Sequence, residues 1–181
     1  MRTKCLSKLV GRCQRMAVFI DGANLARMPT HLSGREEPER SIDFAKLRTL
    51  LNSWGRVTTL NYYTARDYDE RVESFFRVLE SFGYKVIHIA TKTFRDGSRK
   101  GNLDPQIMID TVKSLAGYDT AVIISGDGDF IPCVRYLQEE GKRVVVLSSQ
   151  YGLAADLRES GAAVVYLDDL ERYLTYLRPR R

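Results

Sequence analysis

Strand-like and helix-like segments alternate along almost the whole chain, and this alternation most limits the folds open to it. Short apolar runs rich in β-branched and aromatic residues predict strands, and the segments between them carry apolar residues at helical spacing. The pattern predicts an α/β fold, a three-layer α/β/α sandwich whose central sheet is mostly parallel and covered on both faces. The predicted strands cover residues 16–20, 56–65, 84–90, 121–124, 143–149 and 162–167.

The segments between the strands divide into helices and two loops. A polar stretch with proline and glycine, residues 27–41, predicts a long loop, and the basic residues 91–102 predict a second one. The remaining segments predict helices, which end at glycine where one follows. These helices cover residues 42–55, 69–83, 103–117, 130–137, 152–161 and 169–178.

Charge and composition favour one globular domain with a basic extension. The net charge is +5, and residues 1–15 carry five basic residues and no acid, which accounts for the whole surplus. We expect residues 1–15 to be a flexible extension, residues 16–177 to form a single domain, and residues 178–181 to be a basic end.

Cysteine count and hydropathy suggest the compartment. Three cysteines without metal-type spacing favour a reducing, cytoplasmic location. No apolar run approaches the roughly 18 residues that a transmembrane helix needs, so we expect no membrane partner.

Aspartates follow two of the predicted strands and begin one helix. Asp21 follows the first strand, Asp127 and Asp129 follow the fourth, and Asp104 starts the helix that leads into the fourth. The carboxyl ends of parallel strands meet at one edge of a sheet, where open α/β sheets place their functional groups. We therefore expect these four carboxylates to share a cleft. Each could also be a helix cap or a favourable charge at a helix start.

Crowded carboxylates repel each other unless a cation neutralises them, and oxygen ligands select a hard ion such as Mg²⁺ or Mn²⁺. Such an ion activates water and neutralises a phosphate, so the pattern indicates phosphoester hydrolysis. Asn24 and Ser125 flank the acids and are candidate supporting groups. Asp110 lies roughly 120° around the helix from Asp104 and is the weakest candidate.

Basic residues precede Asp104 and predict contacts with a nucleic-acid backbone. Tyr62 and Tyr63, at the end of the second strand, and Phe94 in the basic loop are candidates for base stacking, although strand tyrosines are usually packing residues. The basic candidates are Lys92, Arg95, Arg99 and Lys100.

Other phosphate chemistries lack their motifs. The first strand leads into "DGAN" rather than G-x-G-x-x-G, and the chain contains no P-loop motif. A phosphatase that forms an aspartyl-phosphate would require D-x-D at the first strand, where the chain has Asp21-Gly22-Ala23.

Three segments together resemble the NYN domain, a branch of the PIN-like nuclease superfamily, and within it the LabA-like proteins of bacteria. The segments are "VFIDGANL" (18–25), "KGNLDPQIMID" (100–110) and "AVIISGDGDFIPCVRYLQEEGKRVVVLS" (121–148). The resemblance implies a PIN-like sandwich and a Mg²⁺- or Mn²⁺-dependent endoribonuclease. It implies that the metal-binding acids are Asp21, Asp104, Asp127 and Asp129, supported by Asn24, Ser125 and, with least support, Asp110.

We therefore expect a metal-dependent ribonuclease that acts on single-stranded or structured RNA. The alternative is a regulatory module that binds RNA or protein and retains the site without turnover. A homo-oligomer is left open.

Overall fold

The structure is a computed structural model, and it describes residues 14–32, 40–65, 70–89, 92–93, 99–100 and 103–177. Its centre is a six-stranded sheet with the order β4-β3-β1-β7-β8-β9. All neighbouring strands in this sheet are parallel, as the apolar runs predict. The strands are β1 (Arg15–Asp21), β3 (Arg56–Thr64), β4 (Lys85–His88), β7 (Thr120–Ile124), β8 (Arg143–Ser148) and β9 (Ala163–Tyr166).

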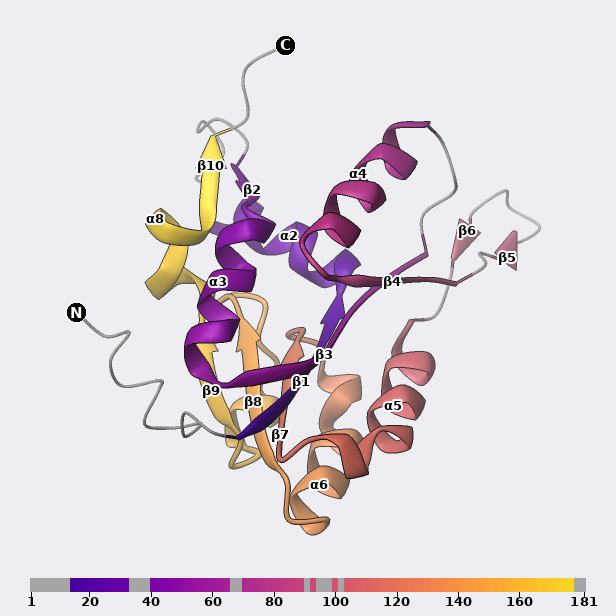
Figure 1. Ribbon diagram of the computed structural model, residues 1–181. Coiled ribbons are helices and arrows are strands. Elements are labelled where there is room, and N and C mark those ends of the chain that lie inside the picture. The colour runs from indigo at the N-terminus through magenta and orange to yellow at the C-terminus, as the bar shows by residue number, and fades with distance from the viewer. Residues whose placement is uncertain are drawn as a thin grey trace.

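Helices cover both faces of the sheet, which confirms the predicted three-layer arrangement (Figure 1). Alternate residues of β1 face opposite layers: Val18 and Ile20 belong to one apolar cluster, and Ala17 and Phe19 belong to the other. One layer contains α2 (Gly22–Leu32), α3 (Phe44–Trp54), α4 (Glu70–Ser81) and α8 (Glu171–Leu174), and the other contains α5 (Asp104–Lys113), α6 (Ile131–Glu139) and α7 (Ala155–Glu159).

The strand order places a topological switch point beside β1. From β1 the chain proceeds outward through β3 to β4, then returns to place β7 on the other side of β1 and continues to β8 and β9. The carboxyl ends of β1 and β7 therefore lie next to each other where the strand order reverses. Open α/β sheets bind their ligands at such a position.

Residues 27–32 are helical, which corrects the long loop expected from residue 27 onward. They form the second half of α2, which continues through Pro29. Asp21 caps the start of this helix, and Leu25 and Met28 are buried in the core. The N-cap and the buried apolar side chains stabilise a helix here, although the polar local composition favours a loop. Of the rest of that predicted loop, residues 33–39 lie outside the described residues, and residues 40–41 form a strand instead.

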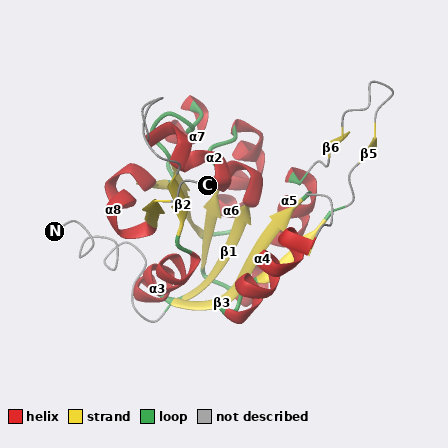
Figure 2. Ribbon diagram, turned by 90° about the horizontal axis from the view of Figure 1, so that it is seen from above, coloured by secondary structure: helices red, strands yellow, loops and turns green. Residues whose placement is uncertain are grey.

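The basic segment before Asp104 contains a short hairpin, where the sequence predicts a loop. Its strands β5 (Lys92–Thr93) and β6 (Arg99–Lys100) pair antiparallel. Figures 1 and 2 show this hairpin standing away from the central sheet. Arg95 and Phe94 lie outside the described residues, as do the side chains of Lys92, Arg99 and Lys100, so their predicted contact with nucleic acid stays a prediction.

The predicted helix over residues 169–178 is also wrong in its second half. The chain passes from a 3₁₀ turn, η3 (Leu167–Leu170), through the short α8 into the strand β10 (Thr175–Leu177). This strand pairs antiparallel with β2 (Arg40–Ile42), which follows the segment after α2. A distant pairing partner explains the difference, because strand propensity depends strongly on tertiary context. Among the described helices, none has the length and hydropathy needed to span a bilayer.

Candidate functional site

Asp21 lies at the switch point, at the end of β1, and is buried. Its Oδ1 accepts hydrogen bonds from the backbone N–H groups of Ala23 and Asn24, each at 3.0 Å. Its Oδ2 accepts one from Ser125 Oγ at 3.3 Å. Burial raises the pKa of Asp21 despite these hydrogen bonds, which act in the opposite direction. Asp21 therefore caps α2 and also connects the ends of β1 and β7.

The loop after β7 is held by side chains on both sides of it. Asn24 Oδ1 accepts a hydrogen bond from the Gly126 N–H at 3.1 Å, and Ser125 Oγ accepts one from the Asp127 N–H at 3.2 Å. Asp127 Oδ1 accepts one from the Asp129 N–H at 3.1 Å. Asp127 and Asp129 are exposed at the start of the 3₁₀ turn η2 (Gly128–Phe130). The predicted supporting roles of Asn24 and Ser125 thus have a geometric basis in this loop.

Asp104, the first residue of α5, belongs to the same electrostatic cluster. Its pKa is raised to about 6, first by burial and then by the negative charges of Asp21, Asp127 and Asp129. Repulsion of this kind weakens with distance, so it indicates that the four carboxylates lie near one another. The structure therefore brings together the four aspartates that the sequence selects, from three distant segments. We refer to these four residues as the aspartate cluster.

The aspartate cluster has the chemistry of a site for a hard cation, but it is not arranged as a closed metal centre. No group of three His, Cys, Asp or Glu side chains is spaced to hold a metal ion within the part of the chain that the structure describes. Carboxylate oxygens are the donors that Mg²⁺ prefers, and a cation would relieve the repulsion at Asp104. Oδ2 of Asp21 accepts one hydrogen bond and retains acceptor capacity, whereas Oδ1 already accepts two. The donor set fits such an ion, provided that the side chains approach each other when it binds.

Two glycines allow the strand ends to pack closely around this site. A Cβ on Gly126 would lie 2.0 Å from the Gly152 carbonyl oxygen and 2.5 Å from Ser148 Oγ. A Cβ on Gly22 would lie 2.5 Å from Tyr62 Cζ and 2.6 Å from the Tyr63 carbonyl oxygen. The sequence analysis did not select either glycine. Each is adjacent in sequence to an aspartate of the cluster, and this adjacency could have indicated that its small size matters.

Asp110 forms a hydrogen-bonded network away from these loops. Its Oδ2 accepts a hydrogen bond from Tyr63 OH at 3.0 Å, and its Oδ1 accepts one from Gln106 Nε2 at 2.8 Å. Asn61 Nδ2 donates to Tyr63 OH at 2.9 Å. Both oxygens of Asp110 therefore bind groups of the domain itself. Asp110 also lines a cavity of about 480 Å³, together with Lys85 and Lys113.

Tyr63→Phe tests whether this network is structural. The variant removes the hydroxyl between Asn61 and Asp110 and leaves a buried amide without its partner. We expect a loss of about 1–3 kcal/mol in the free energy of unfolding, measured with urea. An unchanged free energy of unfolding would show that the network does not stabilise the domain.

The other tyrosine of β3 is buried as well. Tyr62 forms edge-to-face contacts with Phe44 and Phe75, at centroid distances of 5.7 and 6.1 Å. Both predicted stacking candidates on this strand are therefore core residues in the structure, Tyr63 being fully buried.

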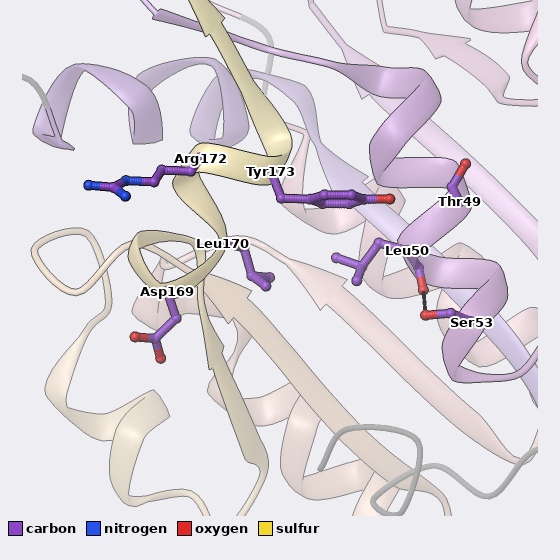
Figure 3. A pocket seen from close by; sticks show the side chains of 7 residues that line it. All are labelled: Thr49, Leu50, Ser53, Asp169, Leu170, Arg172 and Tyr173. Carbon is purple, nitrogen blue, oxygen red and sulfur yellow. Dashed lines mark hydrogen bonds between the residues drawn. The ribbon is translucent and has the colours of Figure 1, made fainter. Parts of the chain in front are cut away.

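A further cavity, of about 380 Å³, lies between α3 and the C-terminal segment (Figure 3). Its seven lining residues include none of the predicted site residues. The hydrogen bond drawn there joins Ser53 Oγ to the Leu50 carbonyl oxygen at 2.6 Å and is internal to α3. The lining residues are Thr49, Leu50, Ser53, Asp169, Leu170, Arg172 and Tyr173.

Comparison with known proteins agrees with the motifs. A family model described as the NYN domain matches residues 15–168. The Low amplitude and bright protein LabA of Synechococcus elongatus is 28% identical over 169 residues, which cover 90% of this chain and 89% of that protein. An uncharacterised protein of Methanocaldococcus jannaschii is 24% identical over 161 residues, covering 86% of this chain and 56% of its own length.

A solved structure supports the fold. The crystal structure of a protein of unknown function from Vibrio parahaemolyticus matches with a TM-score of 0.75 and 23% identity. The match covers 89% of this chain and 96% of that one. At this identity the likeness concerns the fold alone.

Proposed function

Since the chain belongs to the NYN domain family, whose members are typically nucleases, we propose that it hydrolyses RNA phosphodiester bonds with the help of Mg²⁺ or Mn²⁺. The observation that carries the proposal is the placement of Asp21 and Asp127 at the adjoining ends of β1 and β7, joined through Ser125, with Asp104 at the start of α5. The pKa of Asp104 agrees with this placement, because it is raised first by burial and then by the charges of the other three aspartates. Sites with strongly perturbed carboxylates at the carboxyl edge of an α/β sheet are characteristic of catalysis.

In this proposal Asp21, Asp104 and Asp127 would hold the ion, and Asp129 would assist. When bound, a divalent ion would neutralise charge on the phosphate and acidify a water molecule. In the hydrolysis, the oxygen of water would bond to phosphorus and the P–O3′ bond would break. The 3′ oxygen would take up the proton released by the water, so the products would carry a 5′-phosphate and a 3′-hydroxyl. The hydrogen bonds from Ala23, Asn24 and Ser125 orient the carboxylate of Asp21. Asn24, through Gly126, keeps the loop that carries Asp127 against α2.

A labelled single-stranded RNA incubated with increasing Mg²⁺ or Mn²⁺ tests this function directly. We expect endonucleolytic products that depend on the added metal and disappear with EDTA. RNA that is retained but not cleaved at any metal concentration would favour the alternative, a module that binds RNA without turnover. The absence of both cleavage and binding would refute the proposal.

The raised pKa of Asp104, caused first by burial and then by the neighbouring carboxylates, predicts that this residue lowers the stability of the metal-free protein although the proposed activity requires it. Because its pKa in the folded protein is raised to about 6, the folded state binds more protons than the unfolded state between about pH 4 and pH 6. Stability of the metal-free protein should therefore fall as the pH rises through this window. Asp104→Asn should weaken that fall and raise the unfolding midpoint at pH 7.5 in EDTA, while cleavage is lost.

Thermal unfolding of both proteins in EDTA at pH 4.5, 6 and 7.5 measures this effect. Asp156→Asn, which removes an exposed charge from α7, is the matched control. Equal pH profiles for wild type and Asp104→Asn would show that the pKa of Asp104 is not raised in the folded protein.

A further inference from the structure

Tyr151 is the most exposed of the large hydrophobic side chains that the structure describes, with 82% of its surface accessible. It lies in the turn between β8 and α7. Isolated exposed hydrophobic residues are common on protein surfaces and require no explanation. Tyr151 differs because its backbone is anchored on both sides and because its loop contacts the loop of Asp127.

The anchoring involves the residues immediately before and after Tyr151. The Gln150 N–H donates to Asp168 Oδ2 at 2.8 Å, and the Gly152 N–H donates to Ser149 Oγ at 3.0 Å. The turn is therefore held by the side chain of Ser149, which precedes Gln150, and by that of Asp168 in η3. Because this backbone is already held in place, an aromatic ring on it loses little conformational entropy when it binds a ligand.

The same turn packs against the loop that carries the cluster aspartates. The Ala154 N–H donates to the Gly126 carbonyl oxygen at 2.9 Å, and the Gly152 carbonyl contacts Gly126 so closely that no Cβ fits between them. Tyr151 and Asp127 are each one residue from this contact. Their Cα atoms therefore lie within about 14 Å of each other, since consecutive Cα atoms are 3.8 Å apart.

We propose that Tyr151 is a stacking platform for a nucleobase of single-stranded RNA whose phosphate backbone lies at the aspartate cluster. The inference rests on the proposed function and adds a base-binding subsite to it. An exposed ring offers a π-face to any base, and such stacking tolerates different sequences. It also gives a single strand an attachment point that the negatively charged aspartates cannot provide. A duplex, whose bases are already stacked, lacks a free base for this position.

Binding of a fluorescently labelled ten-nucleotide oligoadenylate, measured by anisotropy, tests the subsite. Asp127→Asn serves as the common background, so that RNA is not consumed. Tyr151→Ala should weaken binding about tenfold, and Tyr151→Phe should bind like the background protein, since the stacking energy belongs to the ring. Tyr136→Ala is the matched control, because Tyr136 is also partly exposed, at 38%, but lies on α6.

A set of oligonucleotides with one abasic site each identifies the stacked base. At one position the abasic substitution should weaken binding to the background protein but not to Tyr151→Ala, because the partner ring is already gone. Equal affinity of Tyr151→Ala and its parent for intact RNA would overturn the inference. So would equal losses for Tyr151→Ala and Tyr136→Ala.

The outcomes separate the subsite from the proposed catalysis. If wild type cleaves RNA and Tyr151→Ala binds and cleaves it equally well, the subsite fails and the nuclease stands. If RNA binding depends on Tyr151 but wild type does not cleave, the subsite stands and the nuclease fails. If wild type neither binds nor cleaves RNA, both are overturned.

Discussion

Replacing Asp127 by asparagine is expected to reduce RNA cleavage at least about a hundredfold without unfolding the domain. Groups that only orient metal ligands already contribute about 10- to 100-fold to affinity or activity, so loss of a ligand charge should cost at least as much. The asparagine side chain keeps an oxygen that can accept the hydrogen bond of the Asp129 N–H, so the turn into η2 should persist. The side chain at this position is exposed, and the substitution leaves no cavity.

The measurement is the cleavage rate of labelled single-stranded RNA at saturating Mg²⁺ or Mn²⁺, with the unfolding midpoint recorded for each protein. Asp156→Asn removes the same charge from the exposed surface of α7 and should cleave like wild type. Cleavage by Asp127→Asn at the wild-type rate would exclude this carboxylate from the reaction, and with it the proposed role of the aspartate cluster.

Gly126→Ala is expected to lower both stability and activity, although alanine adds one methyl group. Its Cβ would need the space of the Gly152 carbonyl oxygen, 2.0 Å away, and of Ser148 Oγ, 2.5 Å away. The first is a backbone atom of an anchored turn, so the loops must separate. The hydrogen bond from the Ala154 N–H to the Gly126 carbonyl oxygen and the one from the Gly126 N–H to Asn24 Oδ1 then lengthen or break. Overpacking of this kind costs about 1–3 kcal/mol.

Urea unfolding and RNA cleavage at a temperature where the variant is folded measure the two effects separately. We expect the folded variant to cleave RNA at least about tenfold more slowly, because the loop that carries Asp127 is displaced and small displacements of catalytic groups are costly. Gly117→Ala is the control, since no atom lies within 4 Å of a Cβ at that position. A Gly126→Ala protein as stable and active as Gly117→Ala would mean that the loops are not packed in solution as they are here.

Much of the fold was predictable because its signals are local. Apolar runs such as Ala121–Ile124 become strands of a buried parallel sheet, and α3 ends before Gly55, where the pattern predicts. The gathering of Asp21, Asp104 and Asp127 was also predictable, because parallel strands and the helix before them force their ends to one edge.

The predictions from the sequence were wrong where contacts with distant segments determine the local structure. The end of the chain forms a strand because Arg40–Ile42 is available to pair with it. Residues 27–32 continue a helix because the side chains of Leu25 and Met28 are buried in the core. Tyr62 and Tyr63 are buried by helices whose packing on β3 no local pattern specifies.

Residue types and their periodicity thus sufficed for the layers of the fold and for the edge at which acidic groups meet, since both follow from the regular geometry of strands and helices. The strand order, which makes β1 and β7 neighbours, required the folded chain. So did the contact between Gly126 and Gly152 and the exposure of Tyr151. These features depend on which surfaces pack together across large separations in sequence, and the free energy of that packing is a property of the assembled core rather than of any segment in it.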